Sequence, residues 1–153
     1  MSNKNSAVLV AASGPSYIRE RADLLTQVAL TRFGELSLYP AKAKDAYDFL
    51  VTTREGKCFL IVVEGFSSIR LDLECVETRR DLSWQIDPDT LRWAVSCPTQ
   101  VFLFVVDADT GHGRYLRLND QPLSHGNGRL GSVELPIENT LDEAGIRRLL
   151  TQL

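Results

Sequence analysis

Two adjacent arginines and a nearby tryptophan combine the residue types that single-stranded nucleic-acid grooves use. Arg79 and Arg80 lie in the stretch Thr78–Asp81, and Trp84 follows shortly after it. Guanidinium groups contact phosphates, and an indole ring offers a face on which a base can stack. These three residues are therefore a candidate nucleic-acid-binding site. A solvated loop beside a core tryptophan explains the same residues equally well.

Other polar motifs do not support a catalytic or cofactor site. Gly126–Gly131 spells GxGxxG, but an extended stretch with Pro136 follows it, whereas a dinucleotide site needs a strand and then a helix. His112 and His125 stand in glycine-rich loops, without Cys or acidic residues at metal-binding spacing. We predict solvated loops at these positions. A hydrolase triad is not supported either, because neither histidine falls on a predicted helix or strand.

Composition and cysteine usage limit the class of protein. The chain has 153 residues, of which 44% are hydrophobic, and its net charge is -3, so any nucleic-acid contact needs a local patch. Cys58, Cys75 and Cys97 form no CxxC pair, which argues against a disulfide framework or a zinc site. We expect Cys58 and Cys97 to be buried thiols. The short apolar run Ala7–Ala12 is no export signal, and we expect a cytoplasmic protein without a membrane partner.

The apolar periodicity predicts three helices. The first follows Pro15 and ends near Gly34. The second has Asp87 as its N-cap and reaches Ala94. The third is an amphipathic helix at the end of the chain, and Thr140–Glu143 in front of it has the form of a capping box.

Short apolar segments predict the strands of a mixed sheet. Cys58–Val63 and Val101–Val106 are apolar throughout, as expected of central strands covered on both faces. Ile69–Val76 alternates, which indicates a strand with one wet face. The remaining predicted strands are Leu36–Tyr39, Tyr47–Val51 and Arg114–Leu118, of which Tyr47–Val51 pairs with the first central strand and Arg114–Leu118 with the second. We expect one domain over residues 1–153, with residues 1–13 as a partly ordered segment.

The predicted elements follow the order helix, three strands, helix, strand, and this order is typical of one known group of proteins. It is accompanied by apolar blocks with a few polar marks, which are Tyr47–Val51, Gly56–Ser68, Leu91–Pro98, Val101–Asp107, Arg114–Leu116, Leu135–Ile137 and Asn139. In these features the chain resembles the PD-(D/E)XK nuclease superfamily, and more specifically a bacterial family within it, domain of unknown function 4365. The resemblance implies a restriction-endonuclease-like α/β sandwich, with a mixed central sheet flanked by helices.

The resemblance also implies where a catalytic site would lie. Such nucleases hold Mg²⁺ against the scissile phosphate with carboxylates, and a lysine adds positive charge where water attacks. Asp48 matches the first carboxylate, and Glu20 is similar to an additional acid on the first helix. The second ligand falls on Val62, which offers no oxygen, and the lysine falls on Glu64, which reverses the charge. Because alternate residues of a strand share a face, Glu64 is a candidate for a displaced ligand.

These departures favour a non-catalytic relative. Our leading hypothesis is an accessory or binding module without a cofactor, which contacts nucleic acid or a protein partner; by resemblance it belongs to genome defence or a mobile element. The enzyme alternative is a Mg²⁺-dependent nuclease with Glu20, Asp48 and Glu64 as catalytic residues, of which Asp48 and Glu64 hold the metal. A third hypothesis is a structural protein that self-associates through the strand edge Arg114–Leu118. Asp48 by itself is also explained as a strand-end acid.

Overall fold

A computed structural model describes residues 7–10, 15–71, 82–123 and 131–153 of the chain. The elements, in chain order, are β1 (Ala7–Val10), α1 (Ser16–Thr31), β2 (Leu36–Pro40), β3 (Phe49–Thr53), β4 (Cys58–Phe66), β5 (Leu82–Ile86), α2 (Pro88–Ser96), β6 (Val101–Asp107), β7 (Gly113–Arg117), β8 (Gly131–Leu135) and α3 (Glu143–Leu150). Within the described residues, no helix has the length and apolar character that crossing a bilayer requires. The three predicted helices are confirmed.

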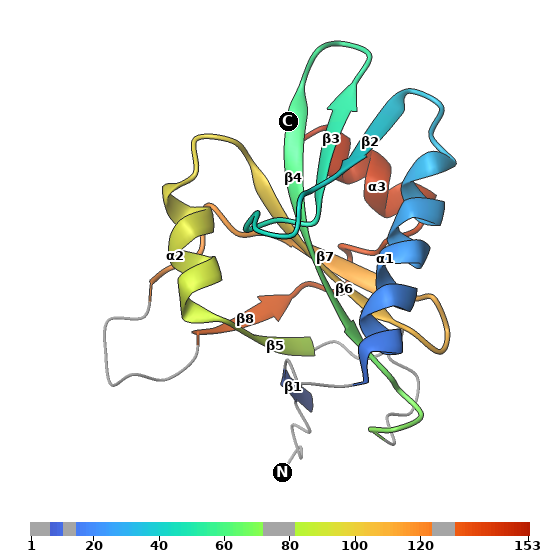
Figure 1. Ribbon diagram of the computed structural model, residues 1–153, viewed down its shortest axis with the longest axis vertical. Helices are drawn as coiled ribbons and strands as arrows, with labels where there is room; N and C mark the ends of the chain where they lie inside the picture. Colours follow the sequence, from blue (N-terminus) through green and yellow to red (C-terminus); the bar gives the residue numbers. More distant parts are fainter. Residues whose placement is uncertain (1–6, 11–14, 72–81, 124–130) are drawn as a thin grey trace.

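A mixed five-stranded sheet lies at the centre of the molecule (Figure 1). Its strand order is β2-β3-β4-β6-β7, in which β4 and β6 run parallel and the other neighbours are antiparallel. All seven residues of β6 are buried, as are most of those of β4, because both faces of these strands are covered. The predicted mixed sheet and its two central strands are therefore confirmed.

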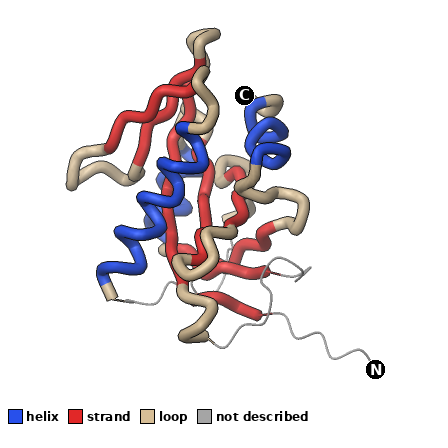
Figure 2. The backbone as a smooth tube through the Cα atoms, turned by 90° about the vertical axis from the view of Figure 1, so that its right-hand side faces the viewer, coloured by secondary structure: helices blue, strands red, loops and turns tan. Residues whose placement is uncertain are grey.

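The two faces of this sheet are covered differently (Figures 1 and 2). On one face, Val63 belongs to a core with Ala22 of α1 and Ile146 of α3. On the other face, Val62 belongs to a second core with Leu91 of α2 and residues of β5 and β8. β5 pairs with β1 in parallel and with β8 antiparallel, and these strands form a second sheet, which the sequence did not predict.

The strand predicted over Ile69–Val76 is wrong where the structure describes it. Residues 69–71 form a turn, in which the backbone N–H of Leu71 donates to the carbonyl oxygen of Ser67 at 3.1 Å. The carboxylate of Asp109 accepts both the Ser67 hydroxyl, at 2.5 Å, and the Ile69 N–H, at 3.1 Å. These local bonds satisfy groups that a strand would pair with a neighbour. Residues 72–76 lie outside the described residues.

The start of α3 differs from the predicted capping box. Its N-cap is Asp142, whose side chain accepts the N–H of Gly145 at 2.8 Å. Thr140, the predicted cap, forms a β-bridge with Arg114 instead, and its hydroxyl donates to Asp142 at 2.7 Å. The N-cap position of Asp87 before α2 is confirmed, but its carboxylate accepts a hydrogen bond from the Thr90 hydroxyl at 3.2 Å rather than from a backbone N–H.

The first half of the outer edge of β7 is covered by the segment before α3. The N–H of Tyr115 donates to the carbonyl of Asn139 at 2.9 Å, and the Asn139 amide donates back to the Tyr115 carbonyl at 3.1 Å. The N–H of Leu141 donates to the carbonyl of Gly113 at 3.1 Å. The start of the edge predicted for self-association, Arg114–Leu118, is therefore not available to a second copy, because the outward groups of residues 113–115 already have partners.

Two expectations about cysteines meet different outcomes. Cys58 is exposed at the start of β4, so its predicted burial is wrong. Cys97, just after α2, is half-buried rather than fully buried, and it packs against the core on that side. Cys75 lies outside the described residues.

The contact between α1 and β4 depends on a glycine. A Cβ atom at Gly65 would lie 2.9 Å from Cβ of Ala22 and 3.0 Å from the carbonyl oxygen of Ile18. We predict that Gly65→Ala lowers the free energy of unfolding by about 1–3 kcal/mol, because it pushes the helix away from the sheet. Urea unfolding followed by circular dichroism measures the change. Gly34→Ala is the control, since nothing lies within 4 Å of that position, and equal losses in both variants would contradict the prediction.

Candidate functional site

Asp48 stands immediately before β3, at the end of its ladder with β4. Its backbone N–H donates to the carbonyl of Ile61 at 2.8 Å. Its carboxylate is used on both sides, since Oδ2 accepts the N–H of Val63 at 2.7 Å and Oδ1 accepts Nη2 of Arg19 at 2.7 Å. Asp48 thus completes the backbone bonding of the central strand and joins it to α1.

Arg19 is the positive centre of the site. Besides its bond to Asp48, its Nε lies 3.7 Å from Oδ1 of Asp23, one helical turn further along α1. Burial alone would lower the pKa of Arg19, but the charges of Asp48 and Glu64 outweigh it and raise that pKa. One guanidinium therefore pairs with two carboxylates and feels the charge of a third, and it stays protonated.

Glu64 lies on β4 within reach of the charges of Arg19 and Asp48, but among the described residues it forms no ion pair or hydrogen bond with either. Burial is the largest cause of its raised pKa, and the charges of Asp48, Asp23 and Asp87 add to it, whereas Arg19 opposes it. The pKa of Asp23 is also raised, first by burial and then by the charge of Asp48. The site thus holds more negative charge than one guanidinium neutralises.

The other two positions of the predicted catalytic site, Glu20 and Val62, do not lie with Asp48 as the resemblance implies. Glu20 is exposed, and in the described part of the chain it forms no hydrogen bond or ion pair with Asp48 or Glu64. Asp23 takes its place as the helical acid, which the sequence analysis missed; its i,i+4 spacing from Arg19 was the available signal. Val62 is 5% exposed and belongs to an apolar core.

A small cleft opens beside the cluster. It has a volume of about 310 Å³ and lies between α1 and the connection from β2 to β3, with Asp23, Gln27, Lys42, Tyr47 and Asp48 among its lining residues. This is smaller than most sites for organic ligands, so any occupant is compact.

The candidate nucleic-acid site is not supported by its tryptophan. Trp84 lies on β5 with 1% exposure and packs against Phe66, with ring centroids 6.3 Å apart. A base has no access to this ring, so the predicted stacking role is wrong. Arg79 and Arg80 lie outside the described residues. Trp93 packs against Tyr47 with near-parallel rings.

Mg²⁺ does not fit this donor set. Both oxygens of Asp48 already accept hydrogen bonds, the guanidinium of Arg19 stands beside them, and Val62 contributes no oxygen. Mg²⁺ needs oxygen ligands in near-octahedral geometry, and a neighbouring fixed cation repels it. Comparisons with protein-family models, with curated proteins and with solved structures each give no match.

Neutralising Glu64 tests the electrostatics of the cluster. Because its folded-state pKa lies above the ordinary 4.5, the resulting stabilisation is fully present below pH 4.5 and is lost as the pH rises through the folded value. We predict that Glu64→Gln raises the free energy of unfolding at about pH 7, and that this gain shrinks toward about pH 4.

Urea unfolding of both proteins across this pH range checks the prediction. The control is Glu134→Gln, a change at an exposed glutamate of β8. If the difference in free energy of unfolding between Glu64→Gln and wild type stays constant with pH, the charge of Glu64 does not destabilise the folded protein.

Proposed function

We propose that this protein is a non-catalytic binding module with a restriction-endonuclease-like fold, in which Arg19 takes the place of a divalent cation. The observation that carries the proposal is the 2.7 Å hydrogen bond between Arg19 and Asp48. Of the three central positions of the nuclease pattern, Asp48 is the one that keeps its residue type, and its carboxylate is bound to a side chain of the same protein. The proposed place in genome defence or on a mobile element, and in the cytoplasm, rests on the resemblance and on the cysteine pattern.

A tethered guanidinium differs from a metal in ways that matter for hydrolysis. Arginine stays protonated at any physiological pH, and its five donors match carboxylate oxygens. It has no exchangeable coordination site, so it cannot bind a water molecule and lower its pKa as a metal does. Arg19 therefore satisfies the acids of the cluster without supplying a nucleophile.

Nuclease assays test the enzyme alternative directly. We predict that the wild-type protein cleaves neither plasmid DNA nor single-stranded DNA or RNA in the presence of Mg²⁺ or Mn²⁺. Agarose gels and labelled oligonucleotides give the readout, and Asp48→Ala is the matched variant. Cleavage by the wild type that disappears in Asp48→Ala would overturn the proposal in favour of an active nuclease.

Removal of Arg19 tests its role as an internal cation. We predict that Arg19→Ala binds Mn²⁺ at least about tenfold more tightly than wild type, because the variant leaves Asp48, Asp23 and Glu64 without their positive partner. Titration calorimetry with Mn²⁺ measures this. Arg21→Ala, a change at an exposed arginine of the same helix, is the control. Equal Mn²⁺ affinity in all three proteins would show that Arg19 does not occupy the cation position.

The outward face of α1 supports a protein partner. Tyr17, Leu24 and Val28 are 57%, 61% and 50% exposed, and at about 100° per residue they form one stripe opposite the face that packs on the sheet. Large exposed apolar side chains in a contiguous group mark protein contacts. The overall net charge and the buried Trp84 do not favour nucleic acid.

Charge complementarity points to a second copy as the partner. Arg21 flanks the apolar stripe on one side and Glu20 on the other, as helical geometry requires. In a dimer whose two-fold axis runs parallel to α1, the Arg21 side of one copy meets the Glu20 side of the other. The self-associating function is thus retained in the proposal, with α1 in place of the β7 edge.

Light scattering after size-exclusion chromatography tests this partner. We predict a dimer for the wild type and a monomer for Leu24→Glu, because the new charge lies within the buried stripe. The control is Leu123→Glu, a change at an exposed side chain beyond the end of β7, and it remains dimeric. A monomeric wild type would exclude this partner, and DNA binding that weakens steeply with salt would favour nucleic acid instead.

A further inference from the structure

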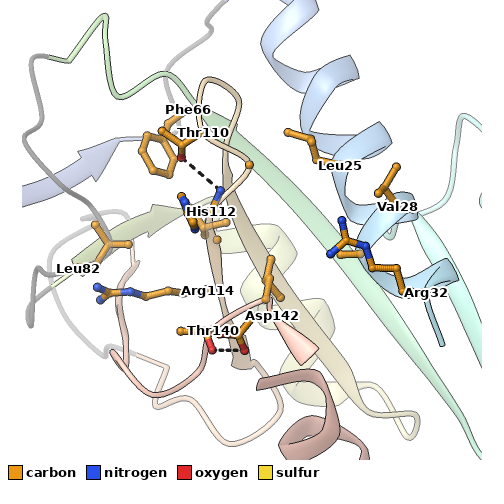
Figure 3. A pocket seen from close by; sticks show the side chains of 15 residues that line it. Leu25, Val28, Arg32, Phe66, Leu82, Thr110, His112, Arg114, Thr140 and Asp142 are labelled. Atoms are coloured by element: carbon orange, nitrogen blue, oxygen red, sulfur yellow. Dashed lines mark hydrogen bonds between the residues drawn. The ribbon is translucent and has the colours of Figure 1, made fainter. Parts of the chain in front are cut away.

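A second cavity lies at the other end of α1 from Arg19. It has a volume of about 510 Å³ and lies between α1, the turn from β6 to β7 and the segment before α3 (Figure 3). This volume is within the range of sites that bind small organic molecules. Neither the nuclease resemblance nor the proposed function assigns it a role.

The wall formed by the β6–β7 turn is fixed by its own hydrogen bonds. The N–H of Asp107 donates to the carbonyl of His112 at 2.7 Å, and the Asp107 carboxylate accepts the Thr110 hydroxyl at 2.7 Å. Gly111 has a φ of +79°, which glycine adopts without steric strain. The position of His112 at the cavity is therefore set before any ligand arrives.

The segment before α3 fixes the opposite wall. A Cβ atom at Gly113 would lie 2.6 Å from Cδ1 of Leu141 and 2.8 Å from the carbonyl oxygen of Val105. Only a glycine lets Leu141 approach β7 so closely, and the Leu141 N–H to Gly113 carbonyl bond of 3.1 Å holds it there. Both walls are thus preformed, which lowers the entropic cost of binding.

The lining divides into an apolar part and a basic part. The apolar side chains come from α1, from the ends of β4 and β5 and from the segment before α3, and they are Leu25, Val28, Ala29, Phe66, Leu82 and Leu141. The basic side chains are Arg32, His112 and Arg114, and Figure 3 places Arg32 and His112 on facing sides of the cavity. Arg114 is 3% exposed, and its Nη1 donates to the carbonyl of Leu135 at 3.2 Å.

The acidic side chain at this cavity, that of Asp142, is already hydrogen-bonded within the protein. Among the described lining residues, Asp142 is the one carboxylate, and it accepts hydrogen bonds from Gly145 and Thr140 as the N-cap of α3. These bonds lower its pKa, so it stays ionised at the helix terminus. Burial is the largest cause of the lowered pKa of Arg114, and the charge of Glu138 opposes it.

We propose that this cavity binds a small molecule that carries one phosphate or carboxylate group on an apolar body. The anionic group pairs with Arg32 and lies beside His112, and the apolar body packs against Leu25 and Leu141. Guanidinium groups match both oxyanions, so the two chemistries share this site. The inference is independent of the Arg19–Asp48 site, although Val28 belongs both to the exposed stripe of α1 and to the cavity lining.

Titration calorimetry with four probes tests the chemistry of the ligand. Phenyl phosphate and benzoate carry both features, inorganic phosphate lacks the apolar body, and phenol lacks the anion. We expect at least one of the first two to bind at least about tenfold more tightly than inorganic phosphate and than phenol, and the comparison between them identifies the preferred anion. No binding of phenyl phosphate or benzoate at millimolar concentration would overturn the proposal.

Two variants locate the binding. Arg32→Ala loses about tenfold or more in affinity for the better probe, because a charge-assisted hydrogen bond is removed. Arg54→Ala, at an exposed arginine in the β3–β4 turn, keeps the wild-type affinity. Amide NMR signals of residues 111–113 shift on titration, and a saturable shift confined to other residues, or equal losses in both variants, would contradict the assignment.

Discussion

The pairing of Arg19 with Asp48 is the interaction on which the candidate site depends. Half-buried carboxylates are costly unless a positive group or a hydrogen-bond donor compensates them. Asp48 obtains a backbone donor from Val63 and a guanidinium from Arg19, and the same guanidinium reduces the repulsion among Asp48, Asp23 and Glu64. Because Arg19 belongs to α1 and Asp48 to the β3–β4 hairpin, this contact also couples the helix to the central strand.

The central sheet was predictable because burial on both faces leaves a simple pattern. Cys58–Val63 and Val101–Val106 are uninterrupted apolar runs, and they form β4 and β6. β5 escaped prediction although Leu82, Trp84 and Ile86 alternate with polar residues. Its partners β1 and β8 lie far away in the sequence, so β5, unlike β3 and β7, has no strand close by in the sequence with which a hairpin could be predicted.

The candidate site was predictable in part for a similar reason. The alternation of a strand places Val62 and Glu64 on one face, and that follows from spacing alone. The role of Arg19 does not, because Arg19 and Asp23 have the spacing of an ordinary exposed helical ion pair. Which side of α1 meets Asp48 depends on the close approach at Gly65, and this is a long-range contact that no local pattern encodes.

Helix α1 presents arginines to two regions of opposite character. At its start, Arg19 is surrounded by more carboxylates than it can neutralise, so this region does not attract an anion. Near its end, Arg32 faces a cavity whose one described carboxylate, Asp142, is bound to the N-terminus of α3. The same guanidinium chemistry is thus internally neutralised in the first region and open to an external oxyanion in the second. The two arginines differ because their neighbouring carboxylates find different hydrogen-bond donors. Asp48 and Asp23 pair with Arg19 itself, whereas Asp142 is bound to the start of α3 and leaves Arg32 to attract an external anion.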